Sequence, residues 1–156
     1  MKSAILTVSL ILVSFAQTTF AVSSPGDNSE VIFKLSEIFS SARVPTPAEI
    51  AESYNCTAFL ALTGSSIVTS FQLEFRSVAG FLMMRATRNF EMRMKFTSKA
   101  LQNTANSDKM FSFRIDSSGN LVGENAQRST SSSYYPRSLL DPAFAASELY
   151  YCTRPK

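Results

Sequence analysis

The segment "IVTSFQLEFR" (residues 67–76) alternates large apolar side chains with polar ones. Its apolar positions include Phe71, Leu73 and Phe75, and the positions between them are Gln72, Glu74 and Arg76. Successive side chains of a β-strand point to opposite faces of the sheet, so a period of two places one set in a core and the other in water. The segment therefore predicts a half-buried antiparallel strand.

The same alternation recurs in residues 90–97 and 110–116. Turn-forming sequences separate these segments, namely "LTGSS", "SVAG" and "DSSGN". Further strand-like segments begin at Tyr54, cover 81–88 and lead to Cys152 near the end of the chain. The pattern predicts a mainly β protein of the α+β class, with about seven antiparallel strands in a small barrel, a sandwich or a curved sheet.

An amphipathic helix is predicted ahead of the strands, in "SEVIFKLSEIFSSA" (29–42). Val31, Leu35 and Ile38 share one helical stripe. We expect this N-terminal helix to pack on the sheet and to cover segment 81–88, which is apolar on both faces. A capping-box pattern in "TPAEIAESY" (46–54) predicts one further helical turn before the first strand.

The chain has only two cysteines, Cys56 and Cys152, and no histidine. A catalytic thiol usually needs a histidine base, and a zinc site would need more Cys or His ligands. A disulfide is therefore the preferred interpretation. It would close a loop of about 97 residues and tie the first strand to the last.

The first 21 residues resemble a secretory signal peptide, with Lys2 ahead of a short apolar run. Small residues permit cleavage after Ala21 or after Ala16. The run is too short and too rich in Ser and Thr for a transmembrane span. We expect a secreted or periplasmic protein with a flexible leader (22–29) and one β-rich domain (30–156).

Charge is uneven along the chain, whose formal net charge is +3. Residues 76–114 are basic, whereas 22–55 are acidic, and the small net charge gives no case for nucleic acid. One hypothesis is an acidic protein or envelope partner, bound by the strand residues Arg76, Arg93, Lys95 and Arg114. The Ser-rich loop 126–138 offers a second contact and an inhibitor-like role, through Tyr134, Tyr135 and Arg137.

A second hypothesis is an apolar small ligand in the interior of the domain. The inward sets of the alternating segments are rich in Phe and Met, which suits an adaptable pocket. The predicted ligand-binding residues are Phe75, Phe90, Met92, Met94, Phe96, Phe111 and Phe113.

Catalysis is the rival interpretation. Without histidine, a hydrolase would depend on carboxylates, and Asp116 with Glu124 is the one close pair across a predicted hairpin. The sequence predicts no metal and no cofactor. A non-catalytic binding module is the preferred function.

Overall fold

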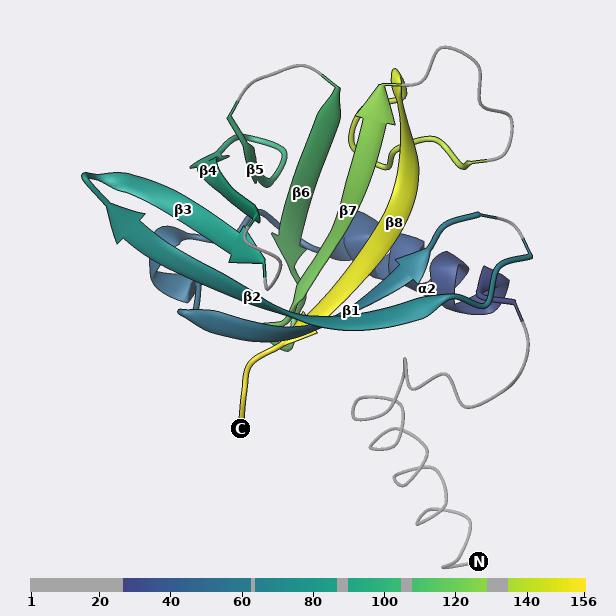
Figure 1. The fold of residues 1–156 in the computed structure, drawn as a ribbon, viewed down its shortest axis with the longest axis horizontal. Helices are drawn as coiled ribbons and strands as arrows, with labels where there is room; N and C mark the ends of the chain where they lie inside the picture. Colours follow the sequence, from purple (N-terminus) through teal and green to yellow (C-terminus); the bar gives the residue numbers. More distant parts are fainter. Residues whose placement is uncertain (1–26, 63, 87–89, 105–107, 129–134) are drawn as a thin grey trace, which may run out of the picture.

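The computed structural model describes residues 27–62, 64–86, 90–104, 108–128 and 135–156. Eight antiparallel strands dominate these ranges (Figure 1). Their bounds are β1 Ser53–Leu60, β2 Val68–Val78, β3 Phe81–Ala86, β4 Phe90–Phe96, β5 Leu101–Asn103, β6 Lys109–Ile115, β7 Leu121–Arg128 and β8 Phe144–Thr153. One α-helix, α2, spans Ser29–Ser41, and a short 3-10 turn, η1, spans Pro47–Glu49.

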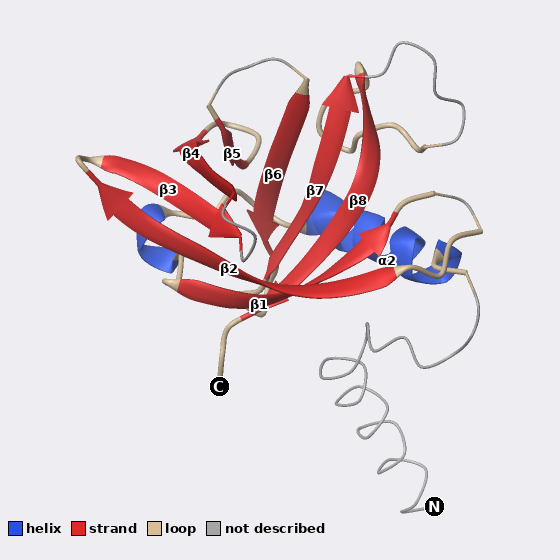
Figure 2. Ribbon diagram, viewed as in Figure 1, coloured by secondary structure: helices blue, strands red, loops and turns tan. Residues whose placement is uncertain are grey.

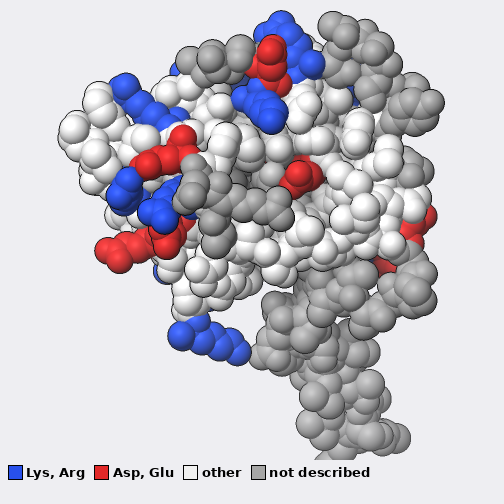
Figure 3. Space-filling view, in the orientation of Figure 1, with Lys and Arg blue, Asp and Glu red and all other residues white. Residues whose placement is uncertain are grey.

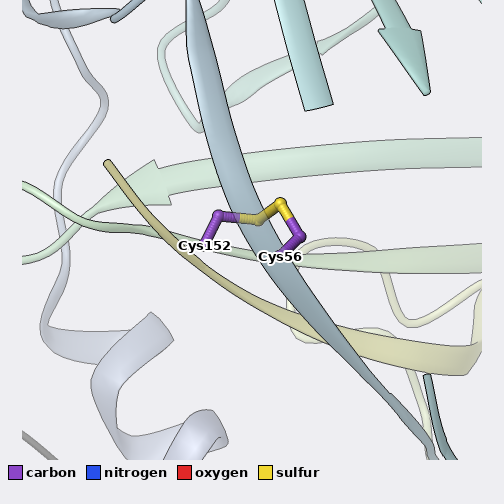
Figure 4. The surroundings of a disulfide bond; sticks show 2 residues. All are labelled: Cys56 and Cys152. Atoms are coloured by element: carbon purple, nitrogen blue, oxygen red, sulfur yellow. A yellow bond between two sulfur atoms is a disulfide. The ribbon is translucent and has the colours of Figure 1, made fainter. Parts of the chain in front are cut away.

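The strands form a closed barrel in which each strand pairs with its neighbours in sequence. Closure comes from pairing of β1 with β8, and Cys56 lies directly opposite Cys152 in that register. The two residues form a disulfide (Figure 4). The predicted link between the first and last strands is therefore confirmed, and of the three architectures considered the barrel is the one that forms.

The period of two divides the strand residues between the barrel interior and its outer surface. Inward positions make up one buried cluster, to which β1 contributes Tyr54 and Cys56, β2 contributes Leu73, and β8 contributes Tyr150. The alternation seen in the sequence therefore reports the two sides of the barrel wall.

Helix α2 packs against the outside of the barrel (Figure 2). Its buried Leu35 and Phe39 form a second cluster with Phe59, Val122 and Leu149, which are outward residues of β1, β7 and β8. Full burial of one such side chain contributes about 1.5–3 kcal/mol, so Leu35 and Phe39 anchor the helix.

Three details of the predicted helix are corrected by the structure. Segment 81–88 is not the covered one, because the helix clusters with β1, β7 and β8, and Phe81 of β3 is 43% exposed. Asn28, which with Ser29 is one of two candidate caps by residue type, makes no side-chain capping bond; its amide donates to the carbonyl of Ile67 at 3.0 Å. Placement of the helix at the N-terminus of the chain is not supported either, since nothing before residue 27 is described.

The prediction of about seven strands falls one short, and the additional strand is β5. Its segment looks polar in sequence, and Asn103 does part of the pairing with its side chain. The amide donates to the carbonyl of Lys109 and accepts from the N–H of Phe111, both at 3.0 Å. A strand of three residues is too short to show period-two alternation in the sequence, and pairing through the Asn103 side chain leaves no hydrophobic pattern.

The predicted signal peptide and most of the predicted leader lie outside the described residues. Within the part of the chain that the structure describes, no helix has the length and apolarity needed to cross a membrane.

Candidate functional site

A cavity of about 980 Å³ opens into the barrel, within the size range of small-molecule sites. Its walls come mainly from inward residues of β1–β4 and β6–β8. On the face shown in Figure 3, basic and acidic side chains lie together at the left and at the top, one acidic side chain lies near the middle, and much of the rest is uncharged. The cavity is lined by Asn55, Cys56, Thr57, Ala58, Thr69, Ser70, Phe71, Gln72, Leu73, Met84, Ala86, Phe90, Phe111, Phe113, Asn125, Glu148, Tyr150 and Thr153.

Aromatic rings form one wall of the cavity around Tyr150. Phe111 and Phe113 stack on its ring with centroid distances of 6.4 and 6.0 Å, and Phe71 meets it edge-on at 5.5 Å. Phe90 extends this wall by contact with Phe111 at 5.6 Å. The arrangement offers both faces and edges of aromatic rings to a bound molecule.

Gly123 makes this aromatic wall possible. Phe113 on β6 and Tyr150 on β8 both lie opposite Gly123 on β7, one on each side. With no side chain between them, the two rings meet across the central strand, although their own strands are not neighbours.

Polar groups stand beside the rings. Asn125 and Glu148 are opposite each other on β7 and β8, and both line the cavity. Burial is the main cause that raises the pKa of Tyr150 far above its usual value, and the negative charge of Glu148 is the second cause. The phenol therefore remains a neutral hydrogen-bond donor. A β-bulge next to Asn125 shifts the register of the two strands, and such bulges re-aim side chains. The Ser147 hydroxyl donates to the carbonyl of Asn125 at 3.0 Å and so links the two strands at this bulge.

The predicted ligand-binding residues divide into two groups. Phe90, Phe111 and Phe113 line the cavity. The others fill the barrel interior away from it: Phe75 and Met94 are buried in the interior cluster, and Met92 and Phe96 pack against that cluster.

Several cavity residues were not singled out from the sequence, notably Asn125, Glu148 and Tyr150. The sequence contained a signal for two of them: period-two alternation, counted back from Cys152, places Tyr150 and Glu148 on the same face of the last strand as Cys152. Composition rules assign Glu to the surface, because its carboxylate is almost never fully buried unless it is paired, so they pointed away from Glu148.

The predicted partner-binding residues of the strands do not form a uniformly basic surface. Arg76 forms an ion pair with Glu91 at 2.6 Å, and the Arg93 guanidinium lies over the Phe81 ring at 3.2 Å. Lys95 is exposed on β4. The outward residues Glu74, Arg85 and Glu91 stand side by side on β2, β3 and β4, so the two signs of charge alternate there.

Arg114 packs against helix α2. It donates to the carbonyl of Phe39 at 3.1 Å and to that of Lys99 at 2.8 Å, and it lies over the Phe39 ring. It therefore supplies positive charge to the C-terminal turn of α2, which has no basic residue of its own. Of the loop residues, Arg137 is exposed and bridges to Ala145, Tyr135 is half-buried, and Tyr134 lies outside the described residues.

The two carboxylates of the hydrolase hypothesis each accept hydrogen bonds from the chain itself. Asp116 accepts from the N–H groups of Ser118 and Asn120 in the β6–β7 turn, at 2.8 and 2.9 Å. It also accepts from the hydroxyl of Tyr151, whose pKa burial and Asp116 raise to about 12.

Glu124 faces outward from β7 yet is fully buried, because segment 138–140 covers it. Its carboxylate accepts from the Ser138 hydroxyl and from the N–H groups of Leu139 and Leu140, at 3.1 and 3.3 Å for the two amides. Burial raises the pKa of Glu124, and these hydrogen bonds together with the charge of Arg114 oppose the rise. The carboxylate thus holds the covering segment on the barrel.

We expect Glu124→Gln to reduce the pH dependence of stability. With a raised pKa in the folded state, the folded protein keeps a proton that the unfolded chain has already lost. Stability therefore falls as pH rises from the unfolded value, about 4.3, through the folded one. Urea unfolding across this window should show a decline in wild type that is smaller in the variant. Glu37→Gln, on the exposed side of α2, is the control; identical pH curves for wild type and Glu124→Gln would contradict the expectation.

No family model, curated protein or solved structure matches this chain. The functional argument therefore depends on the cavity alone. Among the residues that the structure describes, no three potential ligands of the Asp, Glu, His or Cys type come together to hold a metal ion.

Proposed function

We propose that this protein is a non-catalytic binding module that holds one small, largely apolar molecule in the barrel cavity. The observation that carries the proposal is the aromatic wall of Phe71, Phe111, Phe113 and Tyr150 along a cavity of about 980 Å³. Eight-stranded barrels are wide enough either to be filled by side chains or to hold one small ligand. Here Ala58 and Ala86 line the cavity, and their small side chains leave space that larger residues would fill.

The setting that we propose for this function is outside the cytoplasm. The Cys56–Cys152 disulfide is compatible with a secreted or periplasmic location, where thiols oxidise. Such a protein would carry or sequester its ligand there.

Binding of the neutral fluorescent probe N-phenylnaphthylamine to the full chain tests the proposal. We expect saturable fluorescence enhancement in wild type and loss of it in Ala86→Phe, whose ring would occupy the cavity. Arg85→Phe is the matched control, since the adjacent residue is exposed on the outside of β3. Native mass spectrometry of the purified protein provides a second readout, in which a retained ligand adds its mass. Equal probe binding by wild type and a folded Ala86→Phe variant would remove the cavity as the site.

A further inference from the structure

The polar groups of the cavity form a directed chain of hydrogen bonds. The Tyr150 hydroxyl is hydrogen-bonded to the Glu148 carboxylate, which can only accept, so the phenol is the donor. The side chain of Asn125 is hydrogen-bonded to Tyr150 and acts to lower its pKa, as an amide N–H does when it donates to the phenol oxygen. The donors of these residues are thus directed at one another.

Among the described residues, part of the acceptor capacity at the same place is unused. Asn125 is only 8% exposed, and its Oδ1 atom has no hydrogen-bond partner among the described residues. A carboxylate has room for about four hydrogen bonds, and among the described residues Glu148 is hydrogen-bonded to Tyr150, which leaves capacity for a ligand. A buried acceptor without a donor is unfavourable, and a ligand that supplies the donor would remove that cost.

Among the described residues of the cavity wall, no positive charge balances Glu148. None of the described residues that line the cavity is Lys or Arg. The ion pairs found among the described residues use Glu30, Glu49 and Glu91, which lie elsewhere. The surrounding rings of Phe71, Phe111 and Tyr150 add a second attraction for a cation, because the face of an aromatic ring is negative.

We propose that the ligand is an organic amine that binds as its ammonium ion, with N–H groups donating to the Glu148 carboxylate and to Oδ1 of Asn125. Its apolar body contacts the aromatic wall. This inference rests on the proposed function and adds the chemical class of the ligand. A neutral or anionic head group of the same size lacks either the charge or the donors that the two acceptors require.

Three indoles with similar bodies test the inference: tryptamine, ethylindole and indolepropionate, which carry a cationic, a neutral and an anionic head. Because the chain contains no tryptophan, indole fluorescence can be followed in the complex without background from protein tryptophan. Displacement of N-phenylnaphthylamine gives the three affinities on one scale. We expect tryptamine to bind about 10- to 100-fold more tightly than ethylindole, and indolepropionate to bind most weakly.

Variants of Glu148 and Asn125 test whether these two side chains cause the preference for tryptamine. Glu148→Gln keeps the shape of the side chain and should bring tryptamine and ethylindole within about twofold of each other, while ethylindole affinity stays unchanged. Asn125→Leu should lower tryptamine affinity selectively. Glu74→Gln removes an exposed carboxylate from the outside of β2 and should leave the preference as in wild type.

The outcomes separate the two proposals. Equal affinities for the three indoles, a preference for indolepropionate, or failure of all three to displace a bound probe would overturn the ammonium inference while leaving the cavity as a binding site. A preference for tryptamine that survives Glu148→Gln would overturn it as well. Failure of the probe and of every indole to bind would overturn the proposed function itself.

Discussion

Replacing Cys56 and Cys152 together with alanine is expected to lower the free energy of unfolding by about 2–5 kcal/mol. The disulfide joins residues 96 positions apart, so in the unfolded chain it removes the freedom of nearly the whole barrel sequence. In the folded chain it sits where β1 meets β8, the pairing that closes the barrel. Since typical domains have only about 5–15 kcal/mol of total stability, the loss would be large.

Denaturant unfolding of wild type and the double variant measures the effect. The variant should also show a steeper dependence on denaturant, because an unfolded chain without a cross-link exposes more surface. Addition of a reductant should destabilise wild type and leave the variant unchanged, which separates the bond from the loss of two small buried side chains. A difference below about 1 kcal/mol would mean that the β1–β8 hydrogen bonds alone determine closure.

Gly123→Ala is expected to destabilise the protein by about 3 kcal/mol, the upper end of the range for overpacked cores. A Cβ atom at this position would lie 2.5 Å from Cδ1 of Phe113 and 2.5 Å from the backbone oxygen of Ser112. The ring would have to leave the face of Tyr150, and the backbone oxygen cannot yield without moving β6. Probe binding should weaken in parallel, because both rings line the cavity.

Thermal unfolding and the near-ultraviolet circular dichroism of the tyrosines check this prediction. Gly119→Ala is the matched control: its Cβ would meet nothing within 4 Å, and its φ of +82° adds only backbone strain, about 1 kcal/mol. In the double variant Gly123→Ala/Phe113→Leu we expect part of the loss to be recovered, because the ring contact is gone while the Ser112 oxygen remains. A Gly123→Ala variant as stable as wild type, with unchanged probe binding, would contradict this account of the aromatic wall.

Much of the architecture was predictable from local patterns. Period-two alternation identified the strands at 67–76, 90–97 and 110–116, and it assigned Phe75 and Phe113 to the interior correctly. The lack of histidine and the two cysteines led to the disulfide, which the structure contains. These features are readable because they depend on a residue and its nearest neighbours along the chain.

The cavity was predictable only in part. Phe90, Phe111 and Phe113 belong to it, whereas Met92, Met94, Phe96 and Phe75 fill other parts of the same interior. All seven share the inward face, so alternation cannot separate lining from filling. Which of them meets empty space depends on the small residues opposite, such as Ala58 and Ala86 on other strands.

By itself, the sequence determined the strand periodicity, the amphipathic helix segment and the pairing of the cysteines, since each follows from side-chain spacing or from having only two thiols. The tertiary structure alone decided that the strands close into a barrel, that α2 lies on β1, β7 and β8, and that Glu124 faces a covering segment while Glu148 faces the cavity. These outcomes depend on register between strands distant in sequence, where a shift of one residue would turn every side chain to the opposite face. The polar cluster of Asn125, Glu148 and Tyr150 exists because the β7–β8 register brings three residues from two strands to one wall.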